Sequence, residues 1–342
     1  MMRAVHDMFF STSDGQLKSD ACVVVTAMVV LTVLRFLLAG YDGQKDPLWK
    51  PLFNVLIDKA DVAKPKKTYK LAESLWYLCW HVTSLTCTIL LLRAEYGTPG
   101  EPKWLYYFLK DHKGMWFFYE TLTDVENNTI TWPNMPMSGG VRMLKLISMG
   151  FWMSCCLYIH WETRRSDIHI LRFHHFTTVA LLLLEYSYRF HRTGLVGSTN
   201  PRNSSGMQII IILHDIPDVL LFTTKCLSYL RLVPDLVTGA VFLLYGTSHF
   251  VCRLVMLGAY VVRPLFFNIG TPETYEYAMK YVFTVPGGLL CICLLTILTV
   301  MNIYWLNLIV SMIRKFASGA EISTYHRSAT SLAAEDEREK DD

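Results

Sequence analysis

Seven apolar segments, each long enough to cross a lipid bilayer, constrain this 342-residue chain more than any other feature. A membrane-spanning helix needs about 20 mostly apolar residues. Lipid offers no partner for an unpaired backbone group, so each span is expected to be helical. The sequence therefore predicts an all-α polytopic membrane protein, with spans at 21–40, 71–92, 141–161, 169–188, 207–230, 236–262 and 285–311.

Composition supports this class and argues against two others. Charged residues make up 18% of the chain, whereas soluble domains average roughly 25%. The net charge of +3 is too small to indicate nucleic-acid binding. All nine cysteines fall inside the apolar spans and none forms a CxxC pair, so we expect reduced packing residues rather than a redox or zinc site.

Charge and glycosylation signals predict the orientation in the membrane. The 41–70 loop carries seven lysines, which places it in the cytosol by the positive-inside rule. With seven spans, the N-terminus is then lumenal and the C-terminus cytosolic. Glycosylation sequons begin at Asn127 and Asn203, in loops that this orientation places in the lumen. The acidic tail, residues 315–342, is predicted to be disordered.

Four of the spans keep ionisable side chains, although each such residue costs roughly 2.5–3.5 kcal/mol near the bilayer centre. A purely structural bundle rarely keeps so many, and we expect these side chains to face one shared interior cavity. There are eleven of them: Glu73, His81, His174, His175, Glu185, His214, Asp215, Asp218, Lys225, His249 and Arg253.

The closest grouping lies on the fifth span, where His214, Asp215 and Asp218 fall within about one helical turn. His174 and His175 lie on the preceding span, which runs antiparallel to it. A histidine beside a carboxylate is the usual arrangement for general-base or nucleophilic catalysis. We therefore expect these five residues to form a catalytic site.

The alternative for any single intramembrane residue is interhelical hydrogen bonding. For the isolated histidines His81 and His249 we favour this packing role. Glu185 lies near the predicted lumenal end of its span, so a site role and extension towards the membrane surface are equally supported.

The polar residues of the fourth and fifth spans resemble the TLC-domain family and, within it, the ceramide synthases. The resemblance rests on Asp167 ahead of the His174-His175 pair, Ser187-Tyr188 one helix length later, and an HDxxDxxLxxxK element running from His214 to Lys225. Weaker likenesses are KxxESxW from Lys70 and FxxR from Phe250. The resemblance implies a TLC-type helical bundle around an intramembrane cavity over 71–314, preceded in 1–70 by a lumenal N-terminus, one helix and a cytosolic loop.

The resemblance also implies an activity. Ceramide synthases join a sphingoid base, sphinganine or sphingosine, to the acyl group of a fatty acyl-CoA, in the endoplasmic reticulum membrane. Acyl-CoA is then a co-substrate, and no metal or other cofactor is implied. By this resemblance His174 and His175 act on the acyl group, while Asp215, Asp218 and His214 orient or stabilise them.

Further residues receive more general assignments. Four basic residues near the cytosolic ends of spans are predicted to contact the acyl-CoA headgroup: Arg164, Arg165, Arg172 and Lys225. The positive-inside rule explains their position equally well. Polar positions lining the cavity are predicted at Glu73, Trp76, Ser187, Tyr188 and Arg253. Two other functions stay open, a non-catalytic lipid-binding or trafficking protein and an acyltransferase with another amine acceptor. The resemblance is compatible with a homo- or heterodimer, and the sequence does not specify the acyl-chain length.

Overall fold

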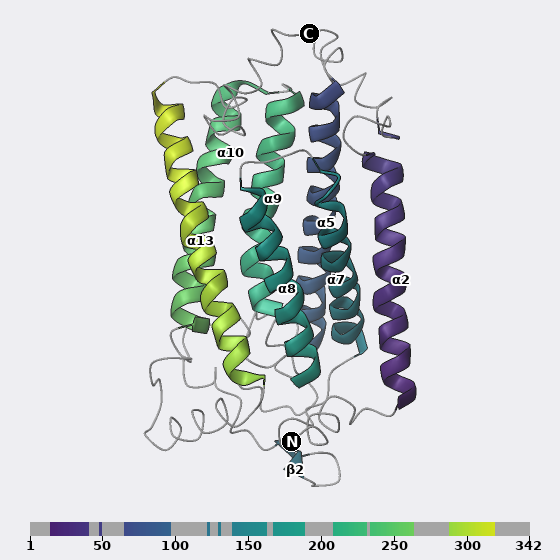
Figure 1. Ribbon diagram of the computed structural model, residues 1–342. Helices are drawn as coiled ribbons and strands as arrows, with labels where there is room; N and C mark the ends of the chain where they lie inside the picture. The colour runs from purple at the N-terminus through teal and green to yellow at the C-terminus, as the bar shows by residue number, and fades with distance from the viewer. Residues whose placement is uncertain are drawn as a thin grey trace.

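The computed structural model is built almost entirely from long helices that stand side by side (Figure 1). It describes residues 14–40, 48–49, 65–96, 122–123, 129–130, 139–162, 167–188, 208–230, 233–262 and 287–318. The helices are α2 (Asp14–Ala39), α5 (Pro65–Tyr96), α7 (Gly139–Tyr158), α8 (Ile168–Tyr188), α9 (Gln208–Leu230), α10 (Asp235–Ser248) and α13 (Gly288–Ala317). Two π-helical stretches, η4 (His249–Met256) and η5 (Gly258–Val262), continue α10. The strands β1 (Leu122–Thr123) and β2 (Thr129–Ile130) form one short antiparallel pair.

These helices correspond one to one with the seven predicted spans, which confirms the all-α fold class. Their ends differ from the predicted ones by a few residues. Two differences matter: α5 begins at Pro65, inside the predicted loop 41–70, and α13 continues to Ala317, so residues 315–317 of the predicted disordered tail are helical. The sequons at Asn127 and Asn203 lie outside the described residues, as do Arg164 and Arg165.

Six of the helical segments close a ring. Around it, α5 contacts α7, α7 contacts α8, α8 contacts α13, α13 contacts η4 and α10, α10 contacts α9, and α9 returns to α5. Successive helices run in opposite directions, so α2 begins and α13 ends at opposite ends of the bundle (Figure 1). The ring is the bundle that the sequence predicts, and it lets six segments contribute side chains to one interior.

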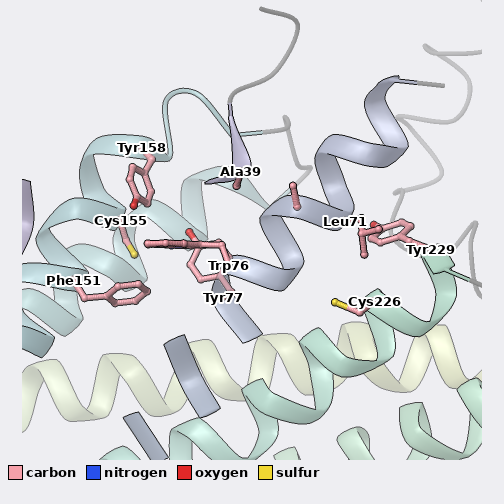
Figure 2. Close-up of a cluster of buried hydrophobic side chains, with 10 residues drawn as sticks. Ala39, Leu71, Trp76, Tyr77, Phe151, Cys155, Tyr158, Cys226 and Tyr229 are labelled. Atoms are coloured by element: carbon pink, nitrogen blue, oxygen red, sulfur yellow. The ribbon is translucent and has the colours of Figure 1, made fainter. Parts of the chain in front are cut away.

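The remaining helix, α2, packs against α7 and α5. Gly150 of α7 allows this approach, because a Cβ atom there would lie 2.7 Å from Ala27 Cβ and 2.8 Å from the Val24 carbonyl oxygen. A hydrophobic cluster fills the junction of α2, α5, α7 and α9 (Figure 2). Its buried residues are Ala39, Leu71, Ala72, Trp76, Tyr77, Phe151, Cys155, Tyr158, Cys226 and Tyr229.

Five helical segments among the described residues are long and apolar enough to cross a membrane. Helices α8 and α9 are not among these five, although both stand within the ring. They carry the two motif halves, with His174 and His175 on α8 and His214, Asp215 and Asp218 on α9. The two helices that do not qualify as membrane spans by themselves are therefore the ones that carry the two motif halves.

Candidate active site

Polar side chains from α5, α8, α9 and η4 meet inside the ring, and we call them the central polar cluster. Its members come from four segments: α5, α9 and η4 are neighbours in the ring, and α8 stands between α7 and α13. The cluster consists of His81 of α5, His174 and His175 of α8, His214, Asp215 and Asp218 of α9, and Arg253 of η4.

The two carboxylates of α9 are held by His81 and Arg253. The Nδ1 atom of His81 lies 2.8 Å from Oδ1 of Asp215, and its Nε2 atom lies 3.8 Å from Oδ2 of Asp218. Nη2 of Arg253 lies 2.7 Å from the same Asp218 oxygen. His81 therefore forms an interhelical hydrogen bond of the kind predicted for it, and this bond also makes it a member of the cluster.

Local sequence explains how α9 presents these groups. Asp215 and Asp218 are three residues apart, so they share one face of the helix. Pro217 stands between them and offers no backbone N–H to its turn. Because α9 packs against α5 on one side and against α10 and η4 on another, this face meets His81 and Arg253.

The π-helical stretch η4 places Arg253 and His249. A π-helix carries an extra residue per turn, and such stretches are frequent at functional sites. Nη2 of Arg253 donates to the His214 carbonyl oxygen at 2.8 Å as well as pairing with Asp218. His249 is buried, and its Nε2–H donates to the Asn302 carbonyl oxygen of α13 at 3.1 Å, which agrees with the interhelical role predicted for it.

The histidine pair of α8 lies against two tryptophans. The ring centroids of His174 and His175 are 5.8 Å apart. Trp152 of α7 lies 6.0 Å from the His174 ring and 5.5 Å from the His175 ring, and Trp305 of α13 lies 5.0 Å from the His174 ring. With these two aromatic residues, all six segments of the ring border the cluster.

The direct partners of the carboxylates differ from the predicted ones. Asp215 and Asp218 were expected to hold His174 and His175, but their hydrogen bond and ion pairs go to His81 and Arg253. His174 lies within electrostatic reach of Asp218 and Arg253. Asp218 therefore interacts with His174 through space, across the same cluster.

Several polar atoms of the cluster are buried and have no hydrogen-bond partner among the described residues. These atoms are Nδ1 of His174, Nε2 of His214, Oδ2 of Asp215 and Nε of Arg253. The Nδ1–H of His214 donates to the Ile210 carbonyl oxygen at 2.8 Å, which leaves its Nε2 as the atom with the lone pair. Unpartnered buried polar atoms are costly, so their concentration here indicates a place for a polar group of a substrate.

The other predicted cavity positions lie away from the cluster. Ser187 lies about 20 Å along α8 from His174 at 1.5 Å per residue, and Tyr188, whose side chain is not described, is one residue further on. Trp76 lies in the hydrophobic cluster of Figure 2, with its indole nitrogen buried. Glu73 lies one turn from both Tyr69 and Tyr77, and those two side chains face Arg35 and Glu162.

Glu185 and Lys225 also differ from the prediction of one shared interior. Glu185 is buried and forms an ion pair with Lys145 of α7, so it does not extend to the membrane surface. The Lys225 ammonium lies 4.9 Å from the centre of the Phe222 ring. Lys225 and the exposed Arg172 stand at the same end of the bundle, and Arg172 contacts His160 at 3.5 Å.

The cluster offers imidazole bases, carboxylates and a fixed cation in a buried setting. Imidazole can accept a proton or an acyl group, and a carboxylate stabilises the cation that forms. Among the described residues, no three His, Cys, Asp or Glu side chains are grouped so as to hold a metal ion. The arrangement is suited to acyl or proton transfer.

Comparison with known proteins places this architecture in a family. The family model of the TLC domain matches residues 70–311. The chain is 26% identical to Ceramide synthase LOH2 of Arabidopsis thaliana over 82% of the chain and 81% of that protein. It is 27% identical to ASC1-like protein 1 of Oryza sativa over 75% of the chain and 72% of that protein, and 24% identical to Ceramide synthase 4 of Bos taurus over 78% and 55%. The chain belongs to the TLC-domain family.

Proposed function

We propose that this chain is a ceramide synthase, which transfers the acyl group of a fatty acyl-CoA to the amino group of a sphingoid base. The products are a ceramide or dihydroceramide and CoA. The central polar cluster is the observation that carries the proposal, because it brings two imidazoles beside ionic carboxylates inside a ring of membrane-type helices. Relatives named ceramide synthases, aligned over most of the chain, give the substrate class.

The chemistry of the reaction fits such a setting. A sphingoid base is an ammonium ion in water and must lose a proton before its nitrogen attacks a thioester. In the reaction the carbon–nitrogen bond forms and the carbon–sulfur bond of the thioester breaks. The ammonium group loses two protons in all, one through a base of the site and one that ends on the CoA sulfur.

We assign the direct role to the α8 histidines. His174 takes the acyl group or the proton, because its Nδ1 atom is buried without a hydrogen-bond partner among the described residues. His175, buried at 4% exposure beside it, is the second imidazole of the site. Asp215 and Asp218 stabilise the positive charge that forms on an imidazole or arrives with the amine.

The two ends of the bundle then have different tasks. Arg172 near the start of α8 and Lys225 near the end of α9 lie at the end of the bundle where α2 finishes and α5 begins (Figure 1). The sequence that joins α2 to α5 is rich in lysine. We propose that this end is cytosolic and receives the CoA phosphates, with the protein in the endoplasmic reticulum membrane. Glycosylation of Asn127 and Asn203, read as a mobility shift on glycosidase treatment, tests this orientation, and cytosolic accessibility of either site contradicts it.

The function is tested with purified protein, sphinganine and a panel of acyl-CoAs, read by mass spectrometry. We expect the wild-type chain to form ceramide and His174→Ala to form none. His169→Ala is the matched control, because His169 is an exposed histidine of the same helix. Folded wild-type protein that forms no product with any acyl-CoA overturns the proposal, and product formed only with another amine identifies a different acceptor.

A further inference from the structure

We infer that His81 is a positioning residue of the acyl-transfer site, which holds Asp215 so that one carboxylate oxygen is bound and the other faces the incoming ammonium group. The inference rests on the proposed function and adds to it a residue outside both halves of the motif. His81 lies on α5, more than ninety residues before His174 in the sequence.

His81 lies between the two carboxylates of α9. Its Nδ1 atom hydrogen-bonds Oδ1 of Asp215 at 2.8 Å, and its Nε2 atom lies 3.8 Å from Oδ2 of Asp218. Asp218 is fixed from its other side by Arg253 at 2.7 Å. An imidazole is the one side chain that can address two carboxylates from opposite edges of a small rigid ring.

The His81 ring is itself fixed by aromatic neighbours. The ring of Phe222 stacks on it, with centroids 5.6 Å apart and planes inclined by 10°. Trp152 lies against it at 6.2 Å, and the same tryptophan contacts His174 and His175. The orientation of His81 is therefore set by packing. Because Trp152 contacts His81 and both residues of the histidine pair, it also fixes the position of the His81 ring relative to that pair.

Charge balance also stabilises His81 between the two carboxylates. Asp215 and Asp218 carry two negative charges, and Arg253 supplies one positive charge. A proton on His81 makes the four side chains neutral as a group. In a buried setting, a balanced group with hydrogen bonds is far less costly than an unpaired carboxylate.

The consequence lies in the second oxygen of Asp215. Oδ1 is occupied by His81, while Oδ2 is buried and has no hydrogen-bond partner among the described residues. A carboxylate oxygen held in this way accepts a charge-assisted hydrogen bond from an ammonium group. His81 thus determines which oxygen of Asp215 meets the amine and at what angle.

Three substitutions at one position test the inference. His81→Phe keeps the ring and its stacking on Phe222 but removes both polar edges. His81→Asn puts an amide nitrogen near the place of Nδ1, towards Asp215. His81→Gln puts one near the place of Nε2, towards Asp218. We expect His81→Phe to lower kcat/KM for the amine about 100-fold, while KM for acyl-CoA stays unchanged. His81→Asn should recover most of this loss, and His81→Gln should not.

A purely structural role gives a different pattern. If His81 only stabilises the bundle, Phe, Asn and Gln variants lower the folded fraction, and kcat/KM for the amine, measured per folded molecule, stays at the wild-type level. That result overturns the inference while the proposed function stands. Equal recovery by Asn and Gln also overturns it, because the Asp215 contact is then not the one that matters.

A measurement that does not need turnover separates the two failures. Thermal unfolding of His81→Phe, Asp215→Asn and the double variant forms a cycle, and we expect the Tm shift of the double variant to be smaller than the sum of the two single shifts. If the Tm shifts show coupling but the wild-type protein acylates no amine, the proposed function is overturned and the positioning role with it. Additive Tm shifts in an active enzyme overturn the inference alone.

Discussion

Two aspartates of this molecule, Asp20 and Asp215, are equally buried at 4% exposure and are used in opposite ways. Asp20 of α2 has both oxygens engaged, one with Nη2 of Arg142 and the other with Nε of Arg142 and the Tyr186 hydroxyl. Asp215 of α9 has one oxygen on His81 and the other without a partner among the described residues. The first carboxylate is saturated by the protein, and the second is half saturated.

This difference indicates that Asp20 joins helices, whereas Asp215 is available for the chemistry of the site. Asp20, Arg142 and Tyr186, which we call the α2 junction, tie α2 to α7 and α8. Helix α2 lies before residues 70–311, which match the TLC domain. Helices in lipid commonly use such polar contacts to associate. A buried carboxylate with only one of its oxygens hydrogen-bonded gives less stability than one with both oxygens bonded. This favours a functional role for Asp215.

The matched substitutions Asp215→Asn and Asp20→Asn test this comparison most directly. We expect Asp215→Asn to reduce acyl transfer by about four orders of magnitude, as removal of a charge partner does in other acyl-transfer sites. Asp20→Asn should lower Tm, because it removes the carboxylate of a partly buried ion pair with Arg142, yet leave turnover per folded molecule near the wild-type value. Steady-state kinetics and thermal unfolding of both variants give the answer. An active Asp215→Asn enzyme, or a folded but inactive Asp20→Asn protein, contradicts the comparison.

Exchanging the charges of an ion pair gives a second test. In the α2 junction we expect Asp20→Arg combined with Arg142→Asp to regain part of the Tm that either single change loses, because only attraction is needed there. In the central polar cluster, Asp218→Arg combined with Arg253→Asp should stay about 100-fold below wild-type activity. The reason is that Arg253 also donates to the His214 carbonyl oxygen and Asp218 also faces His81. Full recovery of activity by the exchange would mean that the pair only joins helices.

The sequence predicts much of this arrangement, for clear physical reasons. Lipid requires every backbone polar group to be paired within the protein, so long and mostly apolar stretches are expected to be helical, and all seven predicted stretches are. The spacing of His214, Asp215 and Asp218 gives their common face, because helical periodicity is local. The burial of Asp215 and His175 is also expected, because ionisable residues on membrane helices face the interior of the bundle rather than lipid.

Sequence reasoning could not predict the partners across the ring. His81 is one histidine in an otherwise apolar stretch of α5, and nothing near it in the sequence refers to Asp215, which is 134 residues away. The same is true of Lys145, which pairs with Glu185 although neither has a charged partner on its own helix turn. Such pairs depend on which helices become neighbours, and only the three-dimensional ring gives that order.

The close packing of α2 against α7 at Gly150 allows a third test, with a smaller expected effect. A side chain at Gly150 meets Ala27 and the backbone of α2, so Gly150→Leu should force α2 away from α7. Overpacking of this kind costs about 1–3 kcal/mol, and we expect a lower Tm with acyl transfer largely kept. Gly139→Ala on the same helix is the control, because a Cβ there meets nothing within 4 Å. Loss of activity in a stable Gly150→Leu protein would extend the site to α2.

The smallest effect concerns the end of the bundle where acyl-CoA is proposed to bind. Arg172 is exposed at the start of α8, and Lys225 lies near the end of α9, so each can contribute one contact to a phosphate. One such contact corresponds to a change of about tenfold or less in apparent affinity, since 1.4 kcal/mol is a factor of ten. We expect Arg172→Ala and Lys225→Ala to raise KM for acyl-CoA by a factor of this size, with KM for the amine unchanged. Arg314→Ala, an exposed charge in the last turn of α13 at the same end, should leave both constants unaltered. If all three variants behave alike, the basic residues at this end follow from membrane orientation, and the functional site is confined to the central polar cluster.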